Sequence, residues 1–408
     1  EWKQIYRLSS IVLQEVILMN QTERQQYLTT EFFKRFGQPP TLFSRAPGRV
    51  DLMGSHTDYN HGYVMTMAID RDAWIAARPR TDRQISIASL NMDGSSTFLL
   101  DDITHDNAVP WTNYVRGVAD VLQISGHNLS GFDGLIHSTI PFGSGLSSSA
   151  ALEVATATLF KLFNNLGIDS VGLALLCQRA ENEFVGVNCG ILDQYSSALG
   201  QTGRALLLDC RNLTTETVAL PKIFQVVICD TRAKRALVRS EYGKRRAQCE
   251  EGARLLAKFY PGVTALRDVS PAQFDEHEAD LPETVAKRCR FIIQENQRVL
   301  DLANALSNND LYALKSLTAD SYLGARDLYQ IGCPEMEAMM KAMNSAPSTI
   351  GARQAGAGFG GSMVSLIDTY SLKPFTSHVQ KEYTAATGIE PKVYPVNAAA
   401  GAGPVVPA

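Results

Sequence analysis

One short segment of the chain, GRVDLMGSHTDYNHG at residues 48–62, places an arginine, two histidines and two aspartates between glycines. It directly follows the strand-like stretch TLFSRAP. Hydrogen-bond donors and acceptors at this density indicate a binding loop, and the chemistry of the ligand has to be inferred from the other motifs of the chain.

A second motif, PFGSGLSSSAALEVA at residues 141–155, sets glycines and serines where a helix is expected to begin. The first turn of a helix offers unpaired amide donors and the positive end of the helix dipole, so phosphate is a natural ligand there. An ordinary capped helix is the alternative, and this stretch alone leaves both open. The motif is neither a Walker A loop nor the dinucleotide fingerprint.

A third glycine-rich loop, GARQAGAGFGGSMVSL at residues 351–366, runs into a predicted strand. Glycine clusters also make tight packing corners, but two such loops in one chain suit a multiply charged ligand held from two sides. Between the loops lie Glu181 and Asp193, in a segment too apolar for a plain solvated loop. A buried carboxylate needs a partner, which Arg49 could supply. One carboxylate for a magnesium ion and one for a hydroxyl group is the minimum apparatus of phosphoryl transfer.

Composition narrows the class of protein. With 408 residues, two or more domains are expected, and a net charge of -4 gives no basic surface for nucleic acid. Seven scattered cysteines suggest a reducing compartment. No apolar run is long enough to cross a membrane, so a cytoplasmic protein without a membrane partner is predicted, although a transit segment before Glu1 stays open.

The elements that must position these motifs alternate along the chain. Strands are predicted at residues 41–47, 63–70, 73–80, 84–90, 96–102, 131–141, 203–210, 224–231, 362–368 and 392–397. Helices are predicted at residues 11–19, 111–126, 148–164, 171–186, 240–260 and 283–306. A change of texture near residue 222 divides the chain into domains 1–222 and 223–408, and the tail from residue 398 is expected to be a loose end.

Together, these motifs and CGILDQYSSALGQ resemble, in order and spacing, the motifs of the GHMP kinases and, within them, the galactokinases. The resemblance implies an α/β (α+β) protein of two domains with the active site in the cleft between them. It implies transfer of the ATP γ-phosphoryl group, with Mg²⁺, to the anomeric C1 hydroxyl of a monosaccharide, with D-galactose as the first choice. The oligomeric state is not implied.

The resemblance also assigns roles to residues. Asp193 would lie beside the reacting hydroxyl, and Arg49 would pair with it and hold the transferred phosphoryl group. Glu181 and Ser149 would bind magnesium. The sugar contacts would be Ser55, His56, Asp58, Gly190, Asp193 and Tyr242. The ATP contacts would be Gly143, Ser144, Gly145, Leu146, Ser147, Ser148 and Gly358, with Trp111 and Tyr114 near the adenine unless they only pack in the core.

On this assignment the polar loop at residues 48–62 faces a polyol, whose hydroxyl groups each need a donor and an acceptor. Zinc is the rival explanation, because His56, Asp58 and His61 are metal-ligand types. Three such residues in a loop are common by chance, so the sugar is favoured.

The chain departs from the family at two positions. Ser55 stands where galactokinases usually carry the glutamate that binds the C6 hydroxyl of galactose, and Asp51 stands where they usually carry asparagine. Serine could reach C6 through water, tolerate a sugar without C6 such as L-arabinose, or admit the carboxylate of D-galacturonate. A non-catalytic sensor of sugar and ATP is a further alternative. A homoserine or mevalonate kinase is disfavoured by the HTDYN motif.

Overall fold

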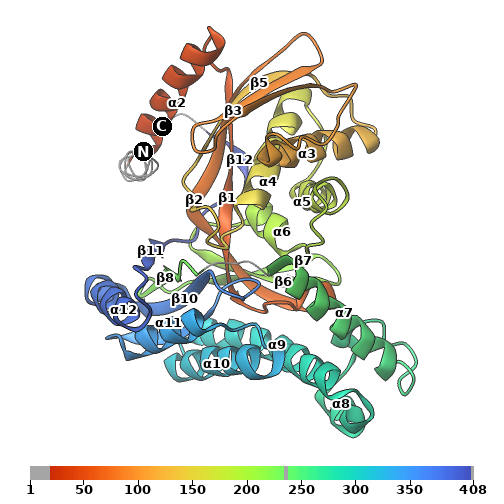
Figure 1. The fold of residues 1–408 in the computed structure, drawn as a ribbon, viewed down its shortest axis with the longest axis vertical. Coiled ribbons are helices and arrows are strands. Elements are labelled where there is room, and N and C mark those ends of the chain that lie inside the picture. The colour runs from red at the N-terminus through yellow and green to blue at the C-terminus, as the bar shows by residue number, and fades with distance from the viewer. Residues whose placement is uncertain (1–18, 234–237, 406–408) are drawn as a thin grey trace.

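The protein folds around two β-sheets, and the computed structural model describes residues 19–233 and 238–405. The larger sheet has eight strands in the order β12-β1-β2-β5-β3-β4, with β6 joined to β2 and β7 to β6. These strands are β1 (Leu42–Met53), β2 (Tyr63–Pro79), β3 (Gln84–Ser89), β4 (Ser95–Leu99), β5 (Phe132–Ser138), β6 (Arg204–Asp209), β7 (Thr214–Ala219) and β12 (Gly403–Pro404). Figure 1 shows this sheet in the upper half of the molecule.

Helices cover both faces of the larger sheet. They are α2 (Gln21–Phe36) on one face and α3 (Asn113–Ile124), α4 (Ser148–Asn164), α5 (Ser170–Arg179) and α6 (Leu192–Leu199) on the other (Figure 1). Successive side chains of a strand point to opposite faces. Trp74 of β2 therefore packs with Leu28 and Phe32 of α2, whereas its neighbour Ile75 belongs to the cluster around Val115 of α3.

The smaller sheet has four strands in the order β11-β8-β10-β9. They are β8 (Phe224–Asp230), β9 (Thr349–Gln354), β10 (Ser362–Asp368) and β11 (Lys392–Val396). The helices of this half are α7 (Val238–Leu256), α8 (Pro271–His277), α9 (Glu283–Asn308), α10 (Leu311–Gly324), α11 (Pro334–Ser345) and α12 (Leu372–Thr387). Along β8, Val227 and Cys229 pack against the methionines of α11, while Val226 and Ile228 face the opposite cluster.

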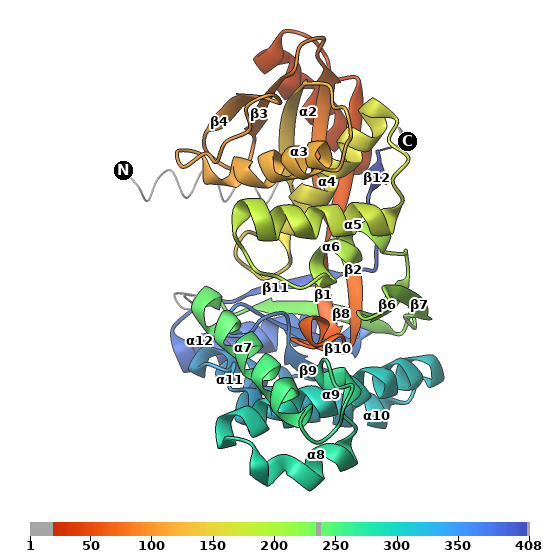
Figure 2. The same ribbon diagram turned by 90° about the vertical axis from the view of Figure 1, so that its right-hand side faces the viewer.

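One apolar cluster joins the two halves. It contains Val50 of β1, Met65 of β2, Ile228 of β8 and Val299 of α9, each of them less than 1% exposed. Figure 2 shows β1 and β2 reaching down from the larger sheet toward β8 and α9. The loop that follows β1 is thereby held against the second half of the molecule, which places it at the boundary between the sheets.

The mixed α/β fold is confirmed, with two corrections to the predicted strands. The strands predicted at 63–70 and 73–80 form one strand, β2 (Tyr63–Pro79). Asp72 in its middle accepts hydrogen bonds from Arg24 at 2.5 Å and Arg45 at 3.0 Å and is thereby tolerated inside the sheet. The strand predicted at 41–47 continues to Met53, since the next residues pair with β2 beyond an irregularity in register between Pro47 and Arg49.

The expectation of a loose C-terminal tail is wrong. Gly403 and Pro404 form β12 and pair with Arg45 and Ser44 of β1, and Val405 is 7% exposed in the cluster beneath α2. Backbone pairing and burial of this apolar residue hold the tail on the larger sheet.

The helix expected at residues 11–19 falls outside the described residues except for its last position. The division of the chain near residue 222 remains a prediction, although β7 and β8 on either side of it belong to different sheets. No helix in the described part of the chain is long and apolar enough to cross a membrane.

Candidate active site

A cavity of about 360 Å³ lies where the loop after β1, the segment between α5 and α6, helix α7 and the loop after β9 meet. This volume suits a small-molecule ligand. Eight residues proposed for chemistry or sugar binding line it: Arg49, Ser55, His56, Asp58, Glu181, Gly190, Asp193 and Tyr242. The fold therefore brings together residues that are up to 193 positions apart in the sequence.

Asp193, in the first turn of α6, is held from two sides. Its Oδ1 lies 2.6 Å from Nη2 and 2.8 Å from Nε of Arg49, and its Oδ2 accepts a hydrogen bond from the Ser147 hydroxyl at 2.6 Å. Arg49 also donates from Nη1 to the carbonyl of Gly145 at 2.8 Å. One guanidinium group thus fixes a pocket carboxylate relative to the glycine-serine loop.

The glycine-serine loop leads into the N-terminus of α4 with a backbone that favours glycine. Gly143 and Gly145 have φ values of 72° and 82°. Ser147 precedes the helix at φ 58° and makes no capping hydrogen bond, because its hydroxyl donates to Asp193. Leu146 is 1% exposed and anchors the loop in the shared core. Ser147 therefore does not cap the first-turn amides of α4. A phosphate-binding helix terminus requires such uncapped amides.

An acidic corner lies beside Asp193, and its main member is Glu181. Glu181 occupies η3 (Ala180–Val185), a π-helical turn after α5, and is 5% exposed. Burial raises the pKa of Glu181, the charge of Asp193 adds to the rise, and hydrogen bonds from Cys189, Gln194 and Ser149 oppose it. None of these groups is cationic. Carboxylate and hydroxyl oxygens are ligands that Mg²⁺ prefers, so Glu181 and Ser149 fit a magnesium site.

Gln194 and Glu153 extend this corner and were missed by the sequence analysis. The Gln194 amide donates to Glu181 at 2.6 Å and to Glu153 at 3.0 Å. Burial raises the pKa of Glu153 well above its ordinary value, the charges of Glu181 and Asp193 add to the rise, and the hydrogen bond from Gln194 opposes it. The only signal in the sequence for Glu153 was its position on the buried face of α4, where the other buried residues are apolar or small.

His56 links the polar loop to the third glycine loop. Its Nε2 lies 3.0 Å from the carbonyl of Ala357, which can only accept, so Nε2 carries the proton and Nδ1 accepts from the Tyr59 hydroxyl at 2.7 Å. Burial lowers the pKa of His56 to about 4, which keeps the ring neutral. The Tyr242 ring lies 5.1 Å away. Both ring nitrogens are engaged by the protein, so His56 positions the loop.

Asp58 and Gly190 are in close contact across the cavity. A Cβ atom on Gly190 would lie 1.7 Å from Oδ2 of Asp58, so only glycine leaves room for this carboxyl group. Burial raises the pKa of Asp58 to about 6; a backbone hydrogen bond from Tyr59 opposes the rise, and Asp193 and Asp51 reinforce it.

With Asp58 in its predicted role as a sugar contact, the affinity for sugar should fall below about pH 6, because a protonated carboxyl group has lost one of its two acceptor oxygens. A folded-state pKa of about 6, above the ordinary aspartate value of 3.8, also means that Asp58 destabilises the fold as the pH rises from about 4 to about 6, by roughly 3 kcal/mol in full. Asp58→Asn should remove the acid limb of kcat/KM, raise KM, and stabilise the protein at pH 7.5 but not at pH 4. An equal change in stability at both pH values would contradict this.

The residues predicted near adenine lie apart from the cavity. Trp111 and Tyr114 are partly buried against the core of the first half, and the Trp111 indole donates to the Asp93 carbonyl at 3.0 Å. Gly358 has φ 79°, and a Cβ there would lie 2.6 Å from the carbonyl of Ile331, which gives a packing reason for the glycine. Roles for these residues in ATP binding remain predictions.

No group of three or more His, Cys, Asp or Glu side chains suited to a metal ion occurs among residues 19–233 and 238–405. The proposed zinc set of His56, Asp58 and His61 is therefore not gathered, since His56 turns both ring nitrogens to protein partners.

Comparison with known proteins agrees with this geometry. Residues 30–79 match the model of the galactokinase galactose-binding signature, and residues 113–201 match that of the GHMP kinases N-terminal domain. The chain is 44% identical to a galactokinase of Roseiflexus sp. (strain RS-1) over 93% of this chain and 97% of the relative. It is 42% identical to a galactokinase of Chloroflexus aggregans over 91% of this chain and 95% of the relative.

A solved structure extends the match to the fold. The galactokinase of Lactococcus lactis complexed with galactose superposes with a TM-score of 0.89 at 31% identity, over 92% of this chain and 98% of that one. Family models, close relatives and fold therefore agree along nearly the whole chain, which belongs to the galactokinase family of the GHMP kinases.

Proposed function

We propose that the protein transfers the γ-phosphoryl group of ATP to the C1 hydroxyl of D-galactose. The observation that carries the proposal is the contact of Asp193 with both Arg49 and Ser147, at the point where the sugar cavity meets the glycine-serine loop. A nucleotide phosphate at the N-terminus of α4 and a hydroxyl beside Asp193 would be neighbours there.

In this mechanism Asp193 accepts a hydrogen bond from the C1 hydroxyl and directs its oxygen at the γ-phosphorus. As the new O–P bond forms and the bond to the β-phosphate oxygen breaks, the hydroxyl proton passes to the carboxylate. A largely dissociative transition state asks for little basicity, so orientation is the main contribution of Asp193. Arg49 holds the carboxylate and stabilises negative charge on the transferred group.

Magnesium is part of the proposal. Glu181 and Ser149 would hold the ion together with phosphate oxygens, and the bound ion would neutralise charge on the β- and γ-phosphates. Gln194 orients Glu181 through its 2.6 Å hydrogen bond. The proposed ligands, Glu181 and Ser149, offer hard oxygen atoms. Burial raises the pKa of Glu181, and a bound cation would lower it again.

We expect Glu181→Gln to raise the magnesium concentration for half-maximal rate at least about tenfold, since a ligand charge is lost. Glu153→Gln is the matched control, because Glu153 also accepts from Gln194 but is not a proposed magnesium ligand, and a glutamine there can still accept this hydrogen bond through its amide oxygen. Magnesium titrations of turnover would compare the two. A similar shift in both variants would contradict the assignment of Glu181.

The proposed function is tested by release of ADP from Mg-ATP with D-galactose, L-arabinose, D-galacturonate, N-acetylgalactosamine and D-glucose. A clear preference for D-galactose is expected. Turnover with none of them, together with sugar-dependent binding of another protein, would favour a sensor. We also propose that the enzyme works in the cytoplasm, which the seven free cysteines support.

A further inference from the structure

Ser55 and Asp51 line one corner of the cavity, and Arg353 contacts both of them from outside the cavity lining. The Ser55 hydroxyl donates to Oδ2 of Asp51 at 2.5 Å and accepts from Nη2 of Arg353 at 3.0 Å. Ser55 and Asp51 both line the cavity, and both are buried, at 2% and 0% exposure. Because the Ser55 hydroxyl donates to Asp51, its proton is directed at that carboxyl group.

Arg353 is held in place by a buried network behind this corner. Its Nε donates to Ser321 at 3.1 Å, and its Nη2 also lies 3.3 Å from Glu295, which forms a second ion pair with Arg298 at 2.8 Å. Its Nη1 lies 3.6 Å from Oδ1 of Asp51. All three nitrogens of the guanidinium group are therefore engaged by the protein, and two acidic side chains balance two arginines.

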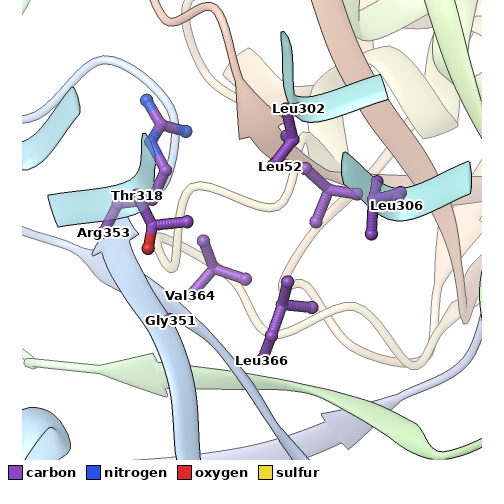
Figure 3. Close-up of a pocket in the computed structure, with 8 residues that line it drawn as sticks. All are labelled: Leu52, Leu302, Leu306, Thr318, Gly351, Arg353, Val364 and Leu366. Carbon is purple, nitrogen blue, oxygen red and sulfur yellow. The ribbon is translucent and has the colours of Figure 1, made fainter. Parts of the chain in front are cut away.

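Figure 3 shows how Arg353 leaves β9 beside a small apolar cavity, with its guanidinium group pointing away from Leu302 and Leu366. That cavity has a volume of about 10 Å³, about the space of one water molecule, and is too small for a ligand. The guanidinium group extends past the apolar side chains to its polar partners Ser55, Ser321 and Glu295. The orientation of Arg353 is fixed by packing as well as by hydrogen bonds.

The corner lies away from the point of phosphoryl transfer. Arg49 and Asp51 are two residues apart in a regularly paired part of β1, so their side chains lie on the same face of the strand, separated by roughly 7 Å along it. Arg49 contacts Asp193 at the transfer point. A sugar with its C1 hydroxyl at Asp193 would therefore present a remote substituent to Ser55.

The Ser55 oxygen has one direction left for a hydrogen bond, and in that direction it can only accept. Its proton is committed to Asp51, and one lone pair is used by Arg353. A hydroxyl group on the sugar can donate to it. A carboxylate has no proton to donate and finds no donor nitrogen on Arg353.

We propose that Asp51 and Arg353 are positioning residues that lock Ser55 as a hydrogen-bond acceptor, so that the corner selects a hydroxyl group on the part of the sugar remote from C1 and rejects a carboxylate there. The proposal rests on the proposed sugar kinase function and names its specificity. It revises the expectation that Ser55 admits D-galacturonate, because the loss of the usual glutamate is offset by the acidic side chain of Asp51.

Two variants test the proposal with purified protein. In Asp51→Asn, the amide oxygen faces Arg353 and the amide group donates to Ser55, which frees the Ser55 proton to point into the cavity as a donor. The ratio of kcat/KM for D-galactose to that for D-galacturonate should then fall at least about tenfold. In Ser55→Ala, the preference for D-galactose over 6-deoxy-D-galactose should fall by about tenfold or more, through KM.

The controls separate specificity from structure and from function. The double variant with Ser55→Ala and Asp51→Asn should show the same two ratios as Ser55→Ala alone. The reason is that Asp51→Asn acts by reversing the direction of the Ser55 hydroxyl, which Ser55→Ala removes. An equal loss on all three sugars in either variant, or an unchanged ratio in the folded variants, would overturn the proposal. Phosphorylation of no sugar by the unaltered protein would instead refute the proposed function. If circular dichroism shows that Asp51→Asn is unfolded, the proposal is tested with Ser55→Ala alone. This variant keeps the four charged side chains of the network, Asp51, Glu295, Arg298 and Arg353.

Discussion

Asp193→Asn is expected to lower kcat about a thousandfold, within the range of 10²–10⁴ for a positioned proton acceptor. Asparagine has nearly the same shape, but its amide oxygen is taken up by Arg49 and its NH2 group cannot accept, so it neither orients the C1 hydroxyl nor takes its proton. KM for D-galactose and for ATP should change far less, because other cavity residues hold both substrates. Steady-state ADP release over a range of both substrates measures the two parameters.

Ser147→Ala is the control for this prediction. It removes the other hydrogen bond to the Asp193 carboxylate, at 2.6 Å, while the ion pair with Arg49 stays. One hydrogen bond corresponds to a loss of about tenfold. If Asp193→Asn kept its rate within tenfold of the unaltered enzyme while remaining folded, Asp193 would not be the group beside the reacting hydroxyl.

The second large effect is expected from Arg49→Lys, with a loss of about a thousandfold in kcat, as for other arginines that stabilise a transferred phosphoryl group. Lysine keeps the positive charge but is a single point charge on a flexible stem. It cannot reach Asp193 and the Gly145 carbonyl at once, which the guanidinium group contacts at 2.6 and 2.8 Å. The carboxylate and the glycine-serine loop would then be positioned independently.

Arg45→Lys on the same strand is the matched control. Arg45 also forms an ion pair, with Asp72 at 3.0 Å, but it lies on the larger sheet and outside the cavity. Its replacement should lower the melting temperature slightly and leave kcat within about twofold. Equal losses of kcat in Arg49→Lys and Arg45→Lys would mean that replacing either arginine of β1 disturbs the fold. Such a result would contradict the role of Arg49 in phosphoryl transfer.

Much of the site could be predicted because its motifs depend on local geometry. The positive φ values of Gly143 and Gly145 and the close approach of Asp58 to Gly190 are demands that only glycine meets easily. The expected contact of Arg49 with Asp193 is present at 2.6 Å, although the Asp193 side chain is 28% exposed rather than buried. These features leave a signal in the sequence because they restrict residue type at fixed spacing.

Contacts between distant segments left no such signal. Arg353 meets Ser55 across 298 residues, and nothing in the spacing of GARQAGAG indicates that its arginine is buried beneath the polar loop. The tail at Gly403 pairs with β1 through its backbone, which carries almost no sequence preference. The proton on Nε2 of His56 follows only from the carbonyl of Ala357, in a loop of the other half. Tertiary packing decides each of these.

The most direct test of the central claim is the position of the phosphate on the product. The protein would be incubated with Mg-ATP and D-galactose, and the product examined by phosphorus NMR with coupling to protons. The expected product is a single phosphate ester whose phosphorus couples to the anomeric proton, and this ester should be absent with Asp193→Asn. A phosphate on any other carbon, or ADP released without a sugar phosphate, would contradict the placement of the C1 hydroxyl beside Asp193.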